Sequence, residues 1–181
     1  KIGAILAPFN WRLSAREIEQ ILTDCDASLV IVDDTGESLL PTAGVEIPIV
    51  RLGAEFNAMR TSAPAHDPGC AAAPDDTALI LYTSGTTGMP KGVMLSNRAM
   101  SYTRDLAAAW DMTERSVNLV SMPLFHIGGC GYGSSTMLVG GHTVLMAEVD
   151  VNEILALIPR HGVTHTFMVP AVVQAVLGAP G

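Results

Sequence analysis

The chain has 181 residues, which is enough to bury one sizeable hydrophobic core. Hydrophobic residues make up 49% of it and charged residues 15%, a composition that excludes an intrinsically disordered tail. The formal net charge of −8 argues against a nucleic-acid-binding surface. The three cysteines, Cys25, Cys70 and Cys130, are far apart in sequence, so we expect reduced thiols in a cytoplasmic protein rather than a disulfide or a metal site.

The two ends of the chain look cut. The sequence begins at Lys1 and ends just after a helix-like segment, so we expect it to be part of a longer protein. Residues 116–147 contain no Asp, Glu, Lys or Arg, but a proline and several glycines interrupt this stretch. A membrane-spanning helix needs about 20 apolar residues without such breaks. We therefore expect a buried segment and no transmembrane helix, with peripheral membrane contact left open.

The first 60 residues alternate between strand-like and helix-like patterns. Residues 2–9 are apolar and suggest a strand or a passage into a loop. Ser14 and Glu17 have the spacing of a capping box, and Ile18, Ile21, Leu22 and Cys25 follow at helical intervals. Residues 28–32 and, more weakly, 47–52 have the apolar, β-branched character of strands. This order predicts the beginning of a parallel α/β layer, followed by a surface connection over residues 61–76.

The same alternation continues to the end of the chain. Apolar residues 78–81 and 93–95 predict two buried strands with a loop between them. Ser96 is placed to cap a helix over residues 97–110, and Asp150 to cap one that ends around residues 159–162. Further strands are predicted at 117–122, 142–147 and 164–169, with helices at 129–139 and from Pro170 onward. Strands that alternate with helices predict an α/β fold with mostly parallel sheets and covering helices.

The segment from Tyr82 to Gly92 reads Tyr-Thr-Ser-Gly-Thr-Thr-Gly-Met-Pro-Lys-Gly and stands between the two predicted buried strands. Its glycines let the backbone approach a ligand, and its hydroxyls, N–H groups and Lys91 can bind anionic oxygens. The glycine spacing differs from that of a Walker A loop, and Pro90 sets Lys91 on a stiff turn. The pattern therefore indicates a loop that binds a polyphosphate.

This string resembles, residue for residue, the signature loop of the adenylate-forming superfamily, which includes acyl-CoA synthetases. The resemblance implies that ATP is bound, with the β- and γ-phosphates held by Thr83, Ser84, Gly85, Thr86, Thr87, Gly88, Met89, Pro90 and Lys91. It also implies that the chain is an incomplete part of the large N-terminal domain. In that reading, residues 1–60 form a first α/β part, 61–76 a connection, and 77–181 the loop and a second α/β part.

A second motif, Pro123-Leu124-Phe125-His126-Ile127-Gly128-Gly129, follows a predicted strand. Parallel α/β sheets bind ligands at the carboxyl ends of their strands. The motif resembles the acyl-CoA synthetase version of this region, which implies that Phe125 and His126 line the acyl and pantetheine channel and that Gly128 and Gly129 widen it. Three roles stay open for His126: bonding the carboxylate or phosphate, gating, or acting as a general base. We favour positioning and gating.

The resemblance implies a two-step reaction in which a carboxylic acid is activated by ATP and transferred to CoA. Mg²⁺ is implied as a companion of the phosphates, with Thr86 as a candidate hydroxyl ligand, and Lys91 and His126 are the expected catalytic residues. Small residues near the channel (Gly131, Gly133, Ser134 and Ser135) favour a roomy site and a fatty acid. Alternatives are an aryl-CoA ligase, a carrier-protein-loading domain, or a non-catalytic nucleotide-binding module. Later motifs of the superfamily are absent, so we expect these 181 residues alone to be inactive.

Overall fold

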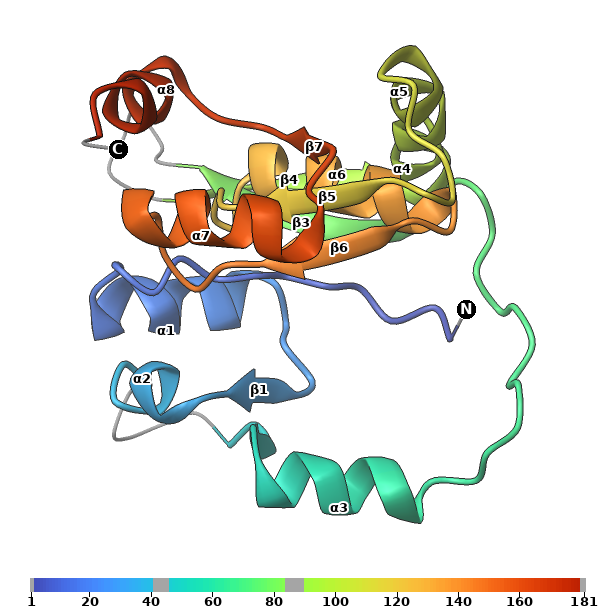
Figure 1. The fold of residues 1–181 in the computed structure, drawn as a ribbon. Coiled ribbons are helices and arrows are strands. Elements are labelled where there is room, and N and C mark those ends of the chain that lie inside the picture. Colours follow the sequence, from blue (N-terminus) through green and yellow to red (C-terminus); the bar gives the residue numbers. More distant parts are fainter. Residues whose placement is uncertain (1, 41–45, 84–89, 180–181) are drawn as a thin grey trace. The chain divides into compact units, whose positions relative to one another are not determined.

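The computed structural model describes residues 2–40, 46–83 and 90–179, and it divides the chain into two compact units, Lys1–Met94 and Leu95–Gly181 (Figure 1). Each unit has its own buried apolar residues, so the sizeable core that the chain length allows is divided between them. The division falls at the second strand of the phosphate-loop hairpin rather than in the connection that precedes the loop.

The first unit is built from short elements. They are α1 (Ala15–Asp24), β1 (Val30–Val32), α2 (Asp34–Glu37), β2 (Ile49–Arg51), α3 (Ala54–Ser62), β3 (Thr77–Thr83) and the first part of β4 (Lys91–Ser96). β1 and β2 pair in parallel, with Val30 opposite Ile49, which confirms the predicted parallel layer. The sequence analysis did not predict α3, an exposed helix that buries none of its residues.

The predicted capping box of α1 is confirmed. The backbone N–H of Ser14 donates to Oε2 of Glu17 over 2.8 Å, and the N–H of Glu17 donates to Oγ of Ser14 over 3.4 Å. These bonds satisfy donors that the first turn of a helix leaves without partners. The apolar stripe that follows buries Ile18, Ile21 and Leu22, which anchors α1 in its unit.

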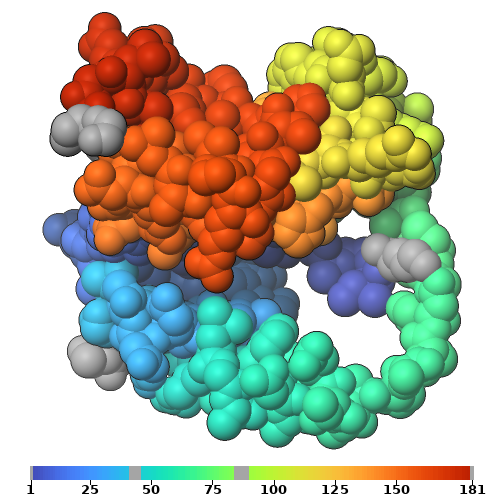
Figure 2. All heavy atoms as spheres, viewed as in Figure 1, coloured from blue at the N-terminus to red at the C-terminus, as the bar shows by residue number. Residues whose placement is uncertain are grey.

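Two features of the first unit differ in extent from their predictions. The expected strand over residues 2–9 is reduced to one bridge, in which Leu6 exchanges hydrogen bonds of 3.0 and 2.9 Å with Ala78 and Ile80. The connection over residues 61–76 is confirmed as a surface segment, because nearly all of its residues are exposed; its atoms form a thin green path in Figure 2. Its first residues, Thr61 and Ser62, still belong to α3.

The two strands around the phosphate loop are not both buried. β3 buries Leu79 and Leu81, as predicted. In β4, however, Val93 is 46% exposed and Met94 70% exposed, so the prediction of a buried second strand was wrong. The reason lies in the pairing, because among the described residues β4 pairs only with β3 and so remains an edge strand.

The second unit contains the rest of the fold. Its elements are α4 (Asn97–Ser101), α5 (Thr103–Ala109), β5 (Val117–Val120), α6 (Ile127–Leu138), β6 (His142–Leu145), α7 (Val151–His161), β7 (His165–Thr166) and α8 (Pro170–Leu177). The strands form a parallel sheet in the order β6-β5-β7, and α6 and α7 pack against it. This arrangement confirms the predicted α/β class with parallel strands.

One predicted helix of the second unit differs in the structure. The helix expected over residues 97–110 is divided at Tyr102. The hydroxyls of Ser101 and Thr103 donate to the carbonyls of Arg98 and Met100, over 2.7 and 2.6 Å, and such local bonds compete with the helical ladder. Further along the chain, α7 includes Pro159 and ends within the predicted range of residues 159–162.

The end of α7 is set by a glycine. The helix continues to His161, and Gly162 ends it in the left-handed conformation with φ of 61°. Among the helices that the structure describes, none combines the length and the apolar character needed to cross a bilayer.

Candidate functional site

The hairpin of β3 and β4 brings together the two ends of the predicted phosphate loop. Thr83 ends β3, and its hydroxyl lies 3.4 Å from the carbonyl oxygen of Lys91, the first residue of β4. The side chains of Thr83 and Lys91 are both exposed, and Pro90 is half-buried. Ser84, Gly85, Thr86, Thr87, Gly88 and Met89 lie outside the described residues. The structure thus places both ends of the loop at one end of a two-stranded sheet.

Tyr82 anchors this hairpin to α1. Its phenolic hydroxyl donates to Oδ2 of Asp24 over 2.6 Å, and its ring meets Phe9 edge-on with centroids 6.5 Å apart. Burial, together with the hydrogen bond to Asp24, raises the pKa of Tyr82 well above its usual value. Sequence reasoning missed Asp24, because nothing in a single sequence connects the end of one helix to a strand 58 residues later.

Gly92 allows the hairpin to pack closely beside Tyr82. A Cβ at this position would lie 2.9 Å from Cγ2 of Ile80 and 3.1 Å from Cζ of Tyr82. Both distances are shorter than ordinary carbon–carbon contacts. The glycine that follows Lys91 therefore has a packing role in β4, in addition to any contact with a ligand.

The second predicted motif lies where β5 leads into α6. His126 is exposed and caps α6, because its Nδ1 accepts a hydrogen bond of 3.1 Å from the backbone N–H of Gly128. In a neutral imidazole whose Nδ1 accepts, the proton is on Nε2. The exposed His126 side chain can therefore offer an N–H donor to an anionic oxygen.

The two glycines of this motif have different surroundings. A Cβ on Gly129 would lie 2.1 Å from the carbonyl oxygen of Pro123 and 2.5 Å from that of Met122, so this glycine lets α6 begin directly against the preceding turn. A Cβ on Gly128 would meet Cε1 of Phe167 at 3.3 Å, and Gly128 lines a cavity. Gly128 thus lies at a cavity and Gly129 is surrounded by backbone, and the channel-widening role of both stays a prediction.

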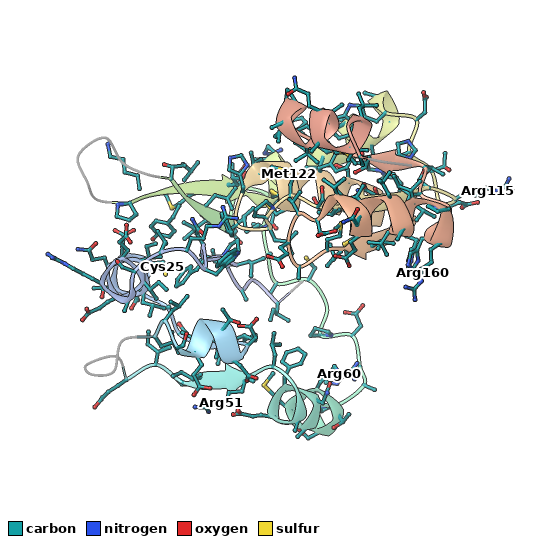
Figure 3. All side chains as sticks on the ribbon, turned by 60° about the vertical axis from the view of Figure 1, so that its left-hand side comes forward. Cys25, Arg51, Arg60, Arg115, Met122 and Arg160 are labelled. Carbon is teal, nitrogen blue, oxygen red and sulfur yellow. The ribbon has the colours of Figure 1, made fainter. Side chains whose placement is uncertain are left out.

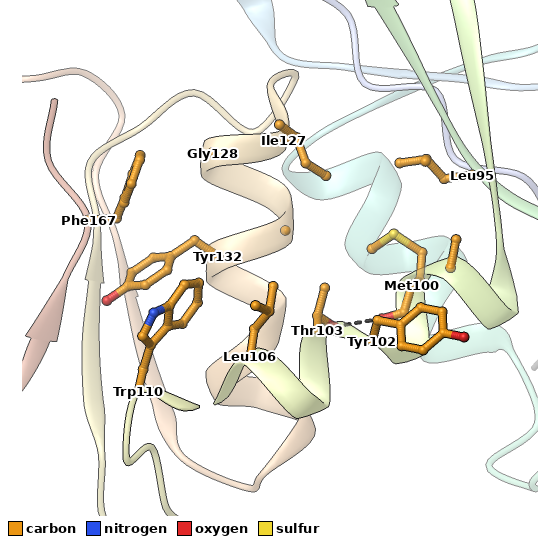
Figure 4. A pocket seen from close by; sticks show the side chains of 12 residues that line it. Leu95, Met100, Tyr102, Thr103, Leu106, Trp110, Ile127, Gly128, Tyr132 and Phe167 are labelled. Atoms are coloured by element: carbon orange, nitrogen blue, oxygen red, sulfur yellow. Dashed lines mark hydrogen bonds between the residues drawn. The ribbon is translucent and has the colours of Figure 1, made fainter. Parts of the chain in front are cut away.

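An apolar cavity of about 300 Å³ lies in the second unit between α4–α5 and α6 (Figure 4). No lining residue carries a charge, and the hydroxyl of Thr103 is already bonded to the carbonyl of Met100. The cavity is lined by Leu95, Ala99, Met100, Tyr102, Thr103, Leu106, Trp110, Ile127, Gly128, Gly131, Tyr132 and Phe167. Such a lining suits a hydrocarbon group.

The small residues expected to make the acyl site roomy are only partly found in this cavity. Gly131 lines it. A Cβ on Gly133 would instead meet Val120 at 3.3 Å, against the sheet. The hydroxyls of Ser134 and Ser135 donate to the carbonyl of Gly131 over 2.9 and 3.0 Å, so their polar groups are used within α6.

The described residues contain no group of three or more His, Cys, Asp or Glu that could hold a metal ion. The three cysteines, all of which the structure describes, are free thiols. Burial raises the pKa of Cys25 and of Cys130, which disfavours the thiolate that binds metals. Thr86, the predicted hydroxyl ligand for Mg²⁺, lies outside the described residues.

Comparison with known proteins decides the family. The family model described as "AMP-binding enzyme" matches residues 1–181. The chain belongs to the AMP-binding enzyme family. A curated relative, the fatty acid–[acyl-carrier-protein] ligase ScoC of Streptomyces coeruleorubidus, is 36% identical over all of this chain and 36% of its own length. The indoleacetate–CoA ligase of Aromatoleum aromaticum is 30% identical over 99% of this chain and 38% of its own length.

A solved structure agrees with the fold. The ATP-bound MatB of Rhodopseudomonas palustris superposes with a TM-score of 0.82 and 27% identity, over 97% of this chain and 36% of that one. The match confirms the resemblance of the Tyr82–Gly92 loop to the adenylate-forming superfamily, and the superposition confirms the predicted fold class. The chain spans a little over a third of the length of these curated relatives. Their names cover different acids and more than one thiol acceptor.

Proposed function

We propose that this chain supplies the pyrophosphate-binding loop and the acid-binding side of an AMP-forming acid–thiol ligase. The observation that carries the proposal is the Tyr82–Gly92 string, whose ends lie on the paired strands β3 and β4 of a chain that belongs to the AMP-binding family. A fatty acid is the leading candidate for the carboxylic acid, because the cavity beside the His126 motif is apolar and carries no charge.

In the first proposed step, a carboxylate oxygen attacks the α-phosphorus of ATP. The bond between the α-phosphorus and the oxygen bridging to the β-phosphorus breaks, pyrophosphate leaves, and an acyl-adenylate forms. Two anions must meet and a highly charged group must leave, so catalysis consists of positioning and charge neutralisation. The loop hydroxyls and N–H groups would hold the β- and γ-phosphates, and the exposed ammonium group of Lys91 would neutralise part of their charge.

In the second proposed step, a thiol loses its proton and its sulfur attacks the acyl carbonyl, so that AMP leaves and a thioester forms. The structure bears on the role of His126 here. With Nδ1 accepting from Gly128, the neutral ring carries its proton on Nε2 and can donate to an oxygen, but it cannot accept a thiol proton there. This geometry supports a positioning role for His126 over that of a general base.

The proposed co-substrates are ATP and CoA, and Mg²⁺ would offset phosphate charge when bound. The described residues offer no acidic cluster for the ion. We expect the phosphates to hold the ion, with the Thr86 hydroxyl as its ligand from this chain.

Two variants of this function are supported by particular relatives. The relative ScoC is named for transfer to an acyl carrier protein, which supports a carrier-protein thiol as the alternative acceptor to CoA. The indoleacetate–CoA ligase is named for an aromatic acid, which supports an aryl acid as the alternative substrate. A non-catalytic nucleotide-binding role is the remaining alternative.

The proposal is tested on the full-length protein by acid-dependent exchange of labelled pyrophosphate into ATP, with straight-chain fatty acids and aryl acids. Acid-dependent exchange is the expected result, and its absence with every acid would overturn the ligase proposal while leaving a nucleotide-binding role. Thioester formation is then measured with CoA and, in parallel, with a pantetheinylated carrier protein. A thioester on CoA is expected, and a product found only on the carrier protein would assign the alternative acceptor.

A further inference from the structure

His165, the first residue of β7, is hydrogen-bonded to the residue that ends α5. Nε2 of His165 lies 2.9 Å from the carbonyl oxygen of Trp110 and must be the donor, because a carbonyl only accepts. The two residues are 55 positions apart in the sequence. The bond therefore joins two elements of the second unit that are distant along the chain.

The carbonyl group of Trp110 lies where α5 ends and the chain turns. Trp110 is the C-terminal cap of α5, and Asp111 follows it in the left-handed conformation with φ of 53°. The last carbonyl groups of a helix have no donor within the helix. His165 supplies that donor at Trp110, and it thereby holds the end of α5 beside β7.

The other ring nitrogen of His165 is bonded as well. Nδ1 lies 2.7 Å from Oγ1 of Thr164, and the same Oγ1 accepts a bond of 2.9 Å from the backbone N–H of Val117 on β5. The carbonyl oxygen of Val117 is farther from this hydroxyl, at 3.2 Å, so the hydroxyl proton goes to Nδ1. When Nδ1 accepts, the neutral ring carries its proton on Nε2, which is the form that the bond to Trp110 requires. Thr164 thus sets the tautomer of His165.

His165 projects from the face of the sheet that α6 covers. Its register partner on β5 is Asn118, and paired residues of parallel strands have their side chains on the same face. Asn118 is fully buried, and its Nδ2 lies within 3.4 Å of the carbonyl oxygen of Tyr132 on α6. Two neighbouring positions on one face of the sheet therefore contact the backbones of α5 and α6.

Two aromatic rings depend on this arrangement for their separation (Figure 4). Trp110 and Phe167 both pack on Tyr132, with ring centroids 5.1 and 5.6 Å from it, and both line the apolar cavity. Each of the two rings is 40% exposed, so packing holds it on one side only. Phe167 follows His165 by two residues. The bond from His165 to Trp110 therefore ties the backbone that carries one ring to the strand that leads to the other.

We propose that His165 is a positioning residue for acid binding, because its bond to the Trp110 carbonyl holds α5 beside β7 and keeps the rings of Trp110 and Phe167 packed on Tyr132. His165 touches no substrate in this scheme and acts through the two rings. The proposal rests on the proposed ligase function. Loss of the N–H donor should weaken acid binding and not ATP binding, since Thr83 and Lys91 at the ends of the phosphate loop belong to the first unit.

The test compares His165→Leu with His165→Gln in the full-length protein. KM for the best acid, KM for ATP and the maximal rate are measured by acid-dependent exchange of pyrophosphate into ATP. Leucine removes both ring nitrogens, whereas glutamine keeps an N–H group that can donate to a carbonyl. The matched control is His161→Leu, which replaces an exposed histidine at the end of α7 in the same unit.

His165→Leu should raise KM for the acid about fivefold, the change expected from the loss of a hydrogen bond of ordinary strength. KM for ATP and the maximal rate should stay nearly unchanged. His165→Gln should recover most of the acid KM, and His161→Leu should alter neither KM. Thr164→Val removes the hydroxyl bonded to Nδ1, so it should raise the acid KM in the same direction by a smaller factor.

An unchanged acid KM in folded His165→Leu would overturn the proposal. Equal increases in the KM for acid and for ATP would overturn it too, because they indicate a general loss of structure. The same holds if His165→Gln binds the acid no better than His165→Leu. Should His165→Leu not fold, an unchanged acid KM in Thr164→Val is the overturning result. An unaltered enzyme that exchanges pyrophosphate with no acid would instead count against the ligase function itself, so the two failures are distinguishable.

Discussion

The hydroxyl of Tyr82 donates a hydrogen bond of 2.6 Å to Oδ2 of Asp24, and this bond joins the end of α1 to the strand that leads into the phosphate loop. Tyr82→Phe removes the donor but keeps the ring against Phe9. The free energy of unfolding should fall by about 1 kcal/mol, the usual contribution of a partly exposed hydrogen bond. KM for ATP should rise as well, because the loop loses one of its anchors.

The measurements are urea denaturation and steady-state kinetics of the full-length protein. Tyr102→Phe is the control, since Tyr102 is 61% exposed and belongs to the second unit, whereas Tyr82 and Asp24 belong to the first. If both substitutions reduce stability equally, the Asp24 bond has no special role.

The same hydrogen bond predicts a dependence on alkaline pH. The pKa of Tyr82 is raised by burial, and further by Asp24, so the folded state favours the protonated phenol. The stability that this pKa shift contributes is fully present below the pKa of tyrosine in the unfolded chain, which is near 10. It is lost as the pH rises from there toward the higher pKa of Tyr82 in the folded protein. The stability advantage over Tyr82→Phe should therefore shrink above about pH 10. Denaturation curves of both proteins between neutral and alkaline pH test this prediction. A stability advantage of the unaltered protein that grew with pH would contradict the raised pKa of Tyr82.

Local signals predicted the second half of this fold well. The caps at Ser96 and Asp150, and the alternation of strands with helices, are properties of neighbouring residues, and the structure has them where the patterns indicated. The burial of β4 could not be predicted in this way. An apolar run such as Val93-Met94-Leu95 shows that a strand could be covered, but whether another element covers it depends on distant parts of the chain.

Lys91 is predicted to stabilise the departing pyrophosphate. It is exposed at the start of β4, the strand that pairs with the one that Thr83 ends. A charge-assisted hydrogen bond contributes about 1.5–3 kcal/mol, so Lys91→Ala should lower acid-dependent pyrophosphate exchange roughly ten- to a hundredfold. The control is Arg160→Ala on α7, which removes a positive charge whose side chain points away from its helix (Figure 3). Unchanged exchange in Lys91→Ala would remove the phosphate role.

His126 has two roles that substitutions can separate. Its Nδ1 caps α6, and loss of an N-cap costs about 1 kcal/mol of stability. His126→Ala removes both the cap and the imidazole, whereas His126→Asn restores a good capping side chain without the ring. We expect Asn to recover the stability that Ala loses but not the acid-dependent turnover, with ATP binding nearly unchanged in both. Turnover that returned with Asn would show that capping alone explains the requirement for His126.

Of the candidate site, only the two sequence motifs could be predicted. The string around Lys91 and the Phe125–His126 pair could be identified from their order in the sequence. The cavity could not be, because Met100, Trp110 and Phe167 carry no pattern that distinguishes a cavity lining from an ordinary core. Gly129 and Gly131 look alike in the sequence, yet one lies against backbone carbonyls and the other lines the cavity. The difference arises because residues two positions apart on α6 lie on different faces of the helix.

The contrast between two glycines of α6 gives a final prediction. A Cβ at Gly129 would lie 2.1 Å from the carbonyl oxygen of Pro123, a backbone atom that cannot rotate away, whereas at Gly133 it would meet the side chain of Val120 at 3.3 Å. In a helix, Gly→Ala gains roughly 0.5–1 kcal/mol from backbone entropy alone. At Gly133 this gain should offset the mild crowding, leaving the free energy of unfolding within about 1 kcal/mol of the original.

At Gly129 the overlap should dominate, and Gly129→Ala should destabilise the protein by about 3 kcal/mol, at the upper end of overpacking costs. Chemical denaturation of the two full-length variants measures the difference directly. Since His126 begins α6 and Gly129 lies in its first turn, Gly129→Ala should also displace the imidazole and reduce acid-dependent turnover, while Gly133→Ala should not. Equal stability of the two variants would mean that α6 can shift away from the Pro123 turn, and the close approach would then not be what positions His126.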